Sequence, residues 1–154
     1  MSRYEGCPIP DTDKDGVNDE QDKCPSTAGI MGNNGCADLQ PFVNEISSQL
    51  KFESGKVNLS KKIYLGLDSL VALMQNNTNI TLVITGHTDN TGTLKINEKL
   101  SLQRAMVVSN YLIKKGIDKK RMSQKGFADT RPTSDNKTLK GRAQNRRVDI
   151  EVVY

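Results

Sequence analysis

The sequence predicts an α+β fold, an α/β sandwich in which a mixed four-stranded sheet carries its helices on one face, preceded by a loop-rich segment. Its 154 residues suffice for one ordinary domain with an appendage. Residues 41–154 show helical and strand periodicity in turn, whereas residues 7–36 have the composition of loops. The net charge also reverses, from −5 over residues 1–40 (three basic, eight acidic) to +9 over residues 41–154 (19 basic, ten acidic). We therefore divide the chain into residues 1–40 and 41–154 and expect separate functions for them.

The second part is expected to alternate helices with strands. Residues 61–76 carry apolar side chains at spacings of three and four, and Ser60 can cap this helix. Residues 79–84 are a β-branched run typical of a buried strand. In chain order we expect helix 41–49, strand 50–53, helix 61–76, strand 80–86, a helix from residue 94 or 97 to residue 115, strand 122–127, polar loop 128–140 and strand 148–153.

Composition also narrows the compartment. No apolar run approaches the roughly 20 residues that a membrane-spanning helix needs, and the first residues do not form a signal peptide. The chain is then either cytosolic or a fragment of a secreted protein. All three cysteines lie in the acidic part, beside a candidate cation site, which favours the fragment because disulfides form in oxidising compartments.

That candidate cation site is the loop of residues 11–22. Acidic residues occupy loop positions 1, 3, 5, 9 and 12, and Gly16 at position 6 permits a sharp turn. Calcium takes about six to eight oxygen ligands, which the carboxylates and the position 7 carbonyl can supply. The expected ligands are Asp11, Asp13, Asp15, Val17, Asp19 and Asp22. Nearby prolines exclude the flanking helices of an EF-hand, and a merely solvated acidic loop is the alternative.

Residues 7–36 resemble a thrombospondin type 3 repeat, from the spaced aspartates with Gly16 to Cys24 and Pro25. Such repeats are found in bacterial outer-membrane proteins, between a membrane part and a wall-binding part. The resemblance implies structural calcium. Of the three possible cysteine pairings we expect Cys24 with Cys36, and Cys7 then resembles the end of a preceding repeat. Three free thiols in a cytosolic protein are the alternative.

A candidate binding site follows the strand at residues 80–86. The polar turn between Gly86 and Gly92 carries Asp89, and Arg104 lies fifteen positions later on the following helix. If both side chains face one pocket, they can hold a ligand with an ammonium and a carboxylate on one carbon, since arginine can clamp a carboxylate with two parallel hydrogen bonds. The alternative is that Asp89 and Arg104 simply pair with each other.

Residues 85–93 and 100–105, with Asn97 and residues 145–150, strongly resemble the OmpA C-terminal-like domain family, which includes the wall-binding domains of Pal and MotB. The resemblance covers roughly residues 41–153 and implies a βαβαβ-type fold that binds peptidoglycan without covalent chemistry. It also implies that Asp89 and Arg104 grip the diaminopimelate of the stem peptide. The other residues that it assigns to the pocket are Thr88, Asn97, Leu100 and Arg146, with Phe52 at the rim. Ile96 departs from the tyrosine usual at that position.

The resemblance further implies a non-enzymatic, periplasmic tether, attached to the outer membrane through a part of the protein outside these 154 residues. Two other functions were weighed. A wall hydrolase using Asp89 lacks a second convergent carboxylate, and His87 and Ser101 complete a hydrolase set only in composition. Nucleic-acid binding would use the basic cluster of Lys114, Lys115, Lys119, Lys120 and Arg121, but no nucleic-acid motif accompanies it.

Overall fold

The computed structural model describes residues 8–154. They divide into two compact units: the described residues up to Leu39 together with Tyr154, and Gln40–Val153. No helix within the described residues is both long and apolar enough to cross a membrane. Cys7 lies outside the described residues, so its expected place at the end of a preceding repeat stays a prediction.

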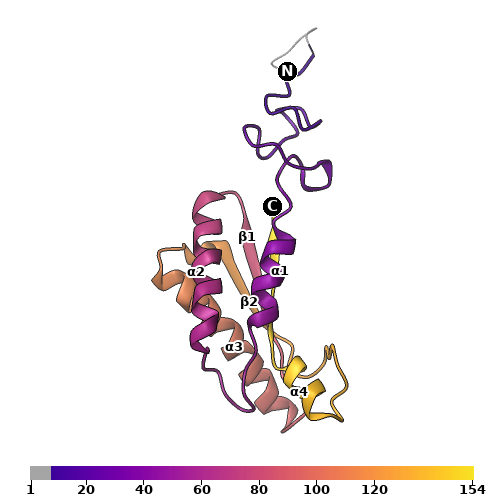
Figure 1. Cartoon of the computed structure of the whole chain (residues 1–154), viewed down its shortest axis with the longest axis vertical. Coiled ribbons are helices and arrows are strands. Elements are labelled where there is room, and N and C mark those ends of the chain that lie inside the picture. The colour runs from indigo at the N-terminus through magenta and orange to yellow at the C-terminus, as the bar shows by residue number, and fades with distance from the viewer. Residues whose placement is uncertain (1–7) are drawn as a thin grey trace. The chain divides into compact units, whose positions relative to one another are not determined.

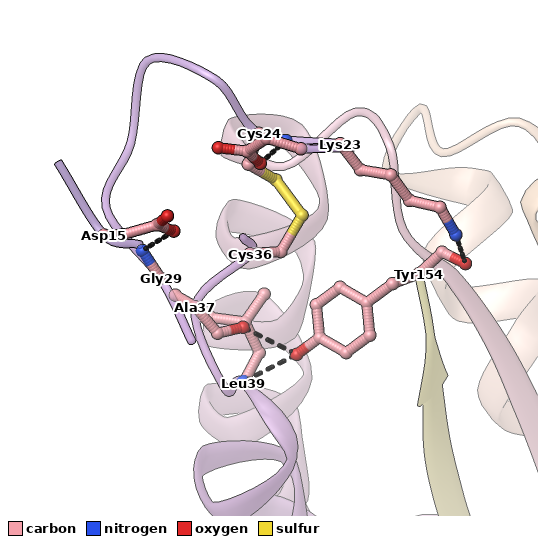
Figure 2. Close-up of a disulfide and its surroundings, with 9 residues drawn as sticks. Asp15, Lys23, Cys24, Gly29, Cys36, Ala37, Leu39 and Tyr154 are labelled. Atoms are coloured by element: carbon pink, nitrogen blue, oxygen red, sulfur yellow. Dashed lines mark hydrogen bonds between the residues drawn. A yellow bond between two sulfur atoms is a disulfide. The ribbon is translucent and has the colours of Figure 1, made fainter. Parts of the chain in front are cut away.

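The first unit is a series of turns held together by a disulfide. Cys24 and Cys36 form the expected bond (Figure 2), which confirms that pairing. The short 3-10 helix η1, Met31–Asn33, lies inside the loop that the disulfide closes. In the same unit, the Tyr154 hydroxyl accepts a hydrogen bond from the Leu39 backbone N–H and donates one to the Ala37 carbonyl, both at 2.8 Å. The disulfide stabilises this segment, which has few apolar side chains to form a core.

The second unit contains a three-stranded mixed sheet in the order β2-β1-β3 (Figure 1). β1 is Thr81–Gly86, β2 is Met122–Gly126 and β3 is Val148–Val153. β1 pairs with β2 in parallel and with β3 in antiparallel orientation. Leu82 lies opposite Met122 and Val152, so these side chains share one buried face, while Glu151 and Lys125 on the other face are exposed.

Three helices cover the buried face, as expected (Figure 1). α1, Gln40–Gln49, packs on β3, and α3, Leu94–Lys114, packs on β1 and β2. α2, Lys61–Asn76, lies against α1 and α3 and has the bounds predicted from its periodicity. Thr93 caps α3 by accepting a hydrogen bond from the Ile96 backbone N–H. Ser60 is the N-cap residue of α2, as predicted, but its side chain makes no capping hydrogen bond.

The predicted fourth strand is reduced to a single bridge between Lys51 and Arg147. The Leu50 carbonyl still accepts a hydrogen bond from the backbone N–H of Val148, the first residue of β3, at 3.1 Å, and the Phe52 N–H donates one to the Arg146 carbonyl at 3.0 Å. Beyond Phe52 the chain leaves the sheet, because the carbonyls of Glu53 and Lys56 accept hydrogen bonds from Arg104 instead of from a neighbouring strand. The sheet therefore has three strands rather than four.

Besides the short 3-10 helices η1 and η2, Lys119–Arg121, one α-helix of the described residues was not predicted from the sequence. α4, Leu139–Asn145, overlaps the end of the expected polar loop. Thr138 caps it by accepting a hydrogen bond from the Gly141 backbone N–H at 2.9 Å. A side chain at Gly141 would place its Cβ 1.8 Å from the Asp135 carbonyl oxygen, so only glycine permits this tight entry into the helix.

Candidate functional site

The expected ligand-binding residues converge on one cavity at the end of β1. It has a volume of about 110 Å³ and is lined by Ser54, Gly55, Thr88, Asp89, Thr91, Ile96, Asn97, Leu100, Arg104 and Arg146. Six of the seven residues predicted from the sequence are in this lining. Phe52, expected at the rim, is instead buried, and its ring lies 5.1 Å from the guanidinium carbon of Arg104. Phe52 therefore packs against Arg104 and does not line the cavity.

Arg104 is fully buried and is held by three backbone carbonyls. Its Nε donates to the Lys56 carbonyl at 3.0 Å, its Nη1 to the His87 carbonyl at 2.9 Å and its Nη2 to the Glu53 carbonyl at 3.0 Å. Burial, with the nearby charge of Arg146, lowers the pKa of Arg104 to about 10, so it keeps its proton at neutral pH. A guanidinium has five N–H groups, so two remain for a ligand.

Asp89 is 4% exposed and is also fixed in orientation. Its Oδ2 accepts a hydrogen bond from Arg146 Nη1 at 2.8 Å, and its Oδ1 accepts one from the Thr91 backbone N–H at 2.9 Å. Burial raises the pKa of Asp89, but the hydrogen bonds from Arg146 and Thr91 outweigh it and hold the pKa below its ordinary value of 3.8. Asp89 is therefore an anion at neutral pH, and each oxygen keeps a lone pair for a further donor.

Asp89 and Arg104 do not neutralise each other. The carboxylate is paired with Arg146, and no ion pair joins Arg104 to any carboxylate among residues 8–154. The alternative expectation, a simple salt bridge between the two, was thus wrong. A charged acid and a charged guanidinium line the same cavity, with bonding capacity left on both.

The approach of β1 to α3 sets this geometry. A Cβ at Gly86 would lie 1.8 Å from the Ser101 carbonyl oxygen, so a glycine is required where the strand crosses the helix. After Gly86, the His87 backbone N–H donates to the Arg147 carbonyl and the Thr88 N–H to the Ala128 carbonyl, both at 2.9 Å. These bonds fix the turn that presents Asp89 to the cavity.

Two further polar side chains complete the lining. Thr88 is 3% exposed, and its hydroxyl finds no hydrogen-bond partner within the described chain. Asn97 is 2% exposed and donates to the backbone carbonyl of Asp89 at 3.3 Å. A buried hydroxyl without a partner is energetically unfavourable, so a polar ligand atom in the cavity would stabilise it.

Sequence reasoning missed the contacts that hold the two charged residues in place. Arg146 was expected in the pocket, but not as the ion-pair partner of Asp89 or as a donor to the Phe52 carbonyl at 2.8 Å. Thr91 had a recognisable signal, because an aspartate often accepts a hydrogen bond from the backbone two residues later. Ser54 and Gly55 carried none, since their position depends on the path of the loop around Arg104.

The residues of the rejected hydrolase set are engaged elsewhere. His87 Nε2 lies 3.2 Å from Asp149 Oδ2, and the Ser101 hydroxyl donates to the Glu98 carbonyl and accepts from the Ala128 N–H. Burial raises the pKa of Asp149, but the hydrogen bond from His87 and the charge of Arg147 outweigh it, so the pKa is lowered. Ser101, His87 and Asp89 therefore form no catalytic triad.

The basic cluster at the end of α3 is partly structural. Arg121 donates to the carbonyls of Ile80, Met74 and Asn77 at 3.1, 2.8 and 2.6 Å, which ties the end of α2 to the start of β1. Lys115 pairs with Asp68 at 3.0 Å and lies over the ring of Tyr111. These contacts give two of the five basic residues a role within the fold.

In the first unit, the predicted cation ligands separate into two groups. One carboxylate oxygen from each of Asp11, Asp13 and Asp15 lies within 4.8 Å of the other two. Asp19 instead accepts two hydrogen bonds from Thr12, at 2.9 and 2.8 Å.

The two remaining predicted ligands, Asp22 and Val17, are both buried. Asp22 accepts a hydrogen bond from the Cys24 N–H at 2.6 Å, and Val17 donates its backbone N–H to Asp15 at 2.8 Å. The structure therefore places the carboxylates of three of the six expected ligands, Asp11, Asp13 and Asp15, in one group.

Comparison with known proteins adds independent information. Residues 51–146 match the OmpA family. The chain is 36% identical to outer membrane porin F of Pseudomonas aeruginosa over 145 residues, which are 92% of this chain and 41% of that protein. It is 35% identical to the peptidoglycan-binding protein ArfA of Mycobacterium tuberculosis over 118 residues, 76% of this chain and 36% of that protein. The chain thus spans less than half the length of either relative.

Among solved structures, the peptidoglycan-associated lipoprotein from Burkholderia pseudomallei matches with a TM-score of 0.66 at 22% identity. The match covers 68% of this chain and 88% of the other. At that identity it bears on the fold alone, and it confirms the predicted α+β class.

Proposed function

The chain belongs to the OmpA family, and we propose that its second unit binds peptidoglycan non-covalently through the cavity between Asp89 and Arg104. One observation carries this proposal: an ionised acid and an ionised guanidinium line one cavity without pairing with each other. Opposite charges held apart in this way match a ligand that is itself a zwitterion. The unit acts by binding, not by catalysis.

The ligand that fits is the free end of diaminopimelate in a peptidoglycan stem peptide. Its ammonium group would donate hydrogen bonds to Asp89, and its carboxylate would accept hydrogen bonds from the two remaining N–H groups of Arg104. The unpartnered hydroxyl of Thr88 and the side chain of Asn97 lie in the same lining and can receive further polar atoms of the ligand. Ile96, 60% exposed, provides an apolar rim.

The relatives support a tethering role. One is named a peptidoglycan-binding protein and another an outer membrane porin. We therefore propose that the second unit holds the wall in the periplasm while another part of a longer protein holds the outer membrane.

Co-sedimentation with insoluble peptidoglycan tests this function. We expect the protein to pellet with diaminopimelate-type peptidoglycan and to be released by a soluble stem peptide that contains diaminopimelate. Peptidoglycan with lysine at that position is the matched control, because its side chain offers an ammonium without the carboxylate. Equal pelleting with both would contradict the proposed ligand, and no pelleting with either would contradict the function.

For the first unit we propose a structural calcium ion held by Asp11, Asp13 and Asp15. One oxygen of Asp11 and one of Asp13 are buried without a hydrogen-bond partner within residues 8–154, which fits a hard cation that binds oxygen. Desolvation, and then repulsion from Asp15, raises the pKa of Asp13, and a bound cation would relieve both effects. Bound calcium would offset most of the negative charge of the cluster and fix the turns, as the resemblance to a thrombospondin type 3 repeat implies.

Calcium is then expected to protect the first unit from protease. At a free concentration of one hundred times Kd, a ligand specific for the folded state stabilises it by about 2.7 kcal/mol, so cleavage within residues 11–36 should slow. Asp13→Asn should remove the effect, whereas Glu20→Gln, which removes an exposed charge from the same loop, should retain it. Identical cleavage with calcium and with chelator would contradict the cation site.

A further inference from the structure

A second cavity is lined by the same loop whose carbonyls hold Arg104. Its volume is about 190 Å³, and it is lined by Lys51, Glu53, Lys56, Asn58, Leu59 and Ser60. The two cavities share one loop: Glu53 and Lys56 line this one, while Ser54 and Gly55 between them line the site of Asp89 and Arg104. Arg104 donates hydrogen bonds to the carbonyls of Glu53 and Lys56, which fixes the four-residue turn 53–56 at both of its ends.

Lys51 brings to this second cavity a positive charge that forms no ion pair within residues 8–154, although Asp149 lies near enough to favour it. Its ammonium donates to the Gln144 carbonyl at 3.3 Å and pairs with no carboxylate in the part of the chain that the structure describes. Burial, and then the nearby charge of Arg147, lowers the pKa of Lys51. An anion beside this ammonium would relieve both effects.

Lys56 brings a second positive charge that can exchange its partner. It pairs with Glu53, but the two side chains are 59% and 73% exposed. Ion pairs as exposed as this contribute only about 0–1 kcal/mol, so an incoming carboxylate can replace Glu53. The cavity therefore presents two ammonium groups against one carboxylate, with the polar side chains of Asn58 and Ser60 beside them.

We propose that this second cavity binds the C-terminal carboxylate of the same stem peptide whose zwitterionic side chain occupies the first cavity. The inference rests on the proposed function, since it requires the peptide to be held by Asp89 and Arg104. A residue of extended peptide spans at most about 3.3–3.6 Å, and the two cavities are lined by adjacent residues of one turn, so a short peptide segment can contact both. The site thus selects for peptides that end in a free acid close to the diamino acid.

Calorimetric titration of the full chain with two synthetic peptides tests this. Both contain diaminopimelate, and they differ only in ending with a carboxylate or a carboxamide. The wild-type protein is expected to bind the acid about fivefold more tightly, the range of a partly exposed ion pair. Lys51→Gln and Lys56→Gln should each shrink that ratio towards one. Lys119→Gln removes the same charge from a surface that contributes to neither cavity and should leave the ratio unchanged.

Folding of the variants is controlled directly. Lys51 forms its β-bridge with Arg147 through the backbone, so replacing its side chain leaves the bridge in place. The midpoint of thermal unfolding of each variant checks that the fold is retained. Lys51→Arg keeps the charge and should keep the preference for the acid. Equal affinity for both peptides, with binding still lost in Asp89→Asn, would overturn the carboxylate site and leave the proposed function standing. A preference that survives both lysine variants would also overturn it, and no binding of either peptide would overturn both proposals.

Discussion

Replacing Arg104 by alanine is expected to lower the free energy of unfolding of the second unit by about 3 kcal/mol or more, because it removes a fully buried side chain and leaves three backbone carbonyls without their donor. Two of those carbonyls belong to Glu53 and Lys56 in one loop, and the third belongs to His87 after β1. Arg104 therefore joins these two segments. Urea unfolding at neutral pH measures the change. A loss under about 1 kcal/mol would show that the guanidinium does not hold the loop.

Two further variants separate the contributions of charge and geometry. Arg104→Lys keeps the positive charge but has no planar fork, so we expect it to remain destabilised. Arg121→Ala is the matched control, because Arg121 also donates to three backbone carbonyls but lies outside the cavity and is only partly buried. It should destabilise the unit less than Arg104→Ala and should leave peptidoglycan binding intact. Loss of binding in Arg121→Ala would mean that destabilisation of the unit alone is enough to abolish peptidoglycan binding.

Asp89→Asn is expected to abolish retention by insoluble peptidoglycan while the unit stays folded. The amide keeps the shape of the carboxylate, but it has a single acceptor oxygen and can keep only one of the hydrogen bonds from Arg146 and Thr91, so we expect a loss of about 1–3 kcal/mol in stability. It removes the negative charge that the ligand's ammonium needs, which for a charge-assisted contact corresponds to about a tenfold or greater loss of affinity. Co-sedimentation together with a thermal unfolding curve measures both effects.

Asp149→Asn is the control for Asp89→Asn. Asp149 is likewise paired with an arginine, Arg147, at 3.0 Å, but its side chain is half exposed and does not line the cavity. Binding should therefore be unchanged. Equal loss of binding in both variants would indicate that the net charge of the unit, rather than the acid in the cavity, attracts peptidoglycan.

Local periodicity was sufficient to predict most of the second unit. The bounds of α2 and β3 agree with the prediction, because apolar spacing determines which face of each element is buried. α3 ends one residue earlier than expected. α4 was missed because it is one short helix with no apolar stripe, and its start depends on the Thr138 cap and the close approach at Gly141. The fourth strand failed for a tertiary reason, since Arg104 takes the carbonyls that a neighbouring strand would use.

The candidate site shows the same division. Asp89 and Arg104 were predictable because a strand end and the following helix bring their side chains to one place, and the family resemblance assigned them a role. Their partners were not predictable, because Arg146 is 57 positions from Asp89 and the groups around Arg104 are backbone carbonyls, which residue identity does not encode. That Asp89 and Arg104 stay unpaired with each other follows from these partners alone.

The most direct measurement is a calorimetric titration with two stem peptides that differ only in having diaminopimelate or lysine at one position, since that change removes one carboxylate and keeps the ammonium. If Arg104 clamps that carboxylate while Asp89 holds the ammonium, the wild-type protein should bind the lysine peptide at least about tenfold more weakly. Asp89→Asn should bind neither peptide. Equal wild-type affinity for the two peptides would contradict the account.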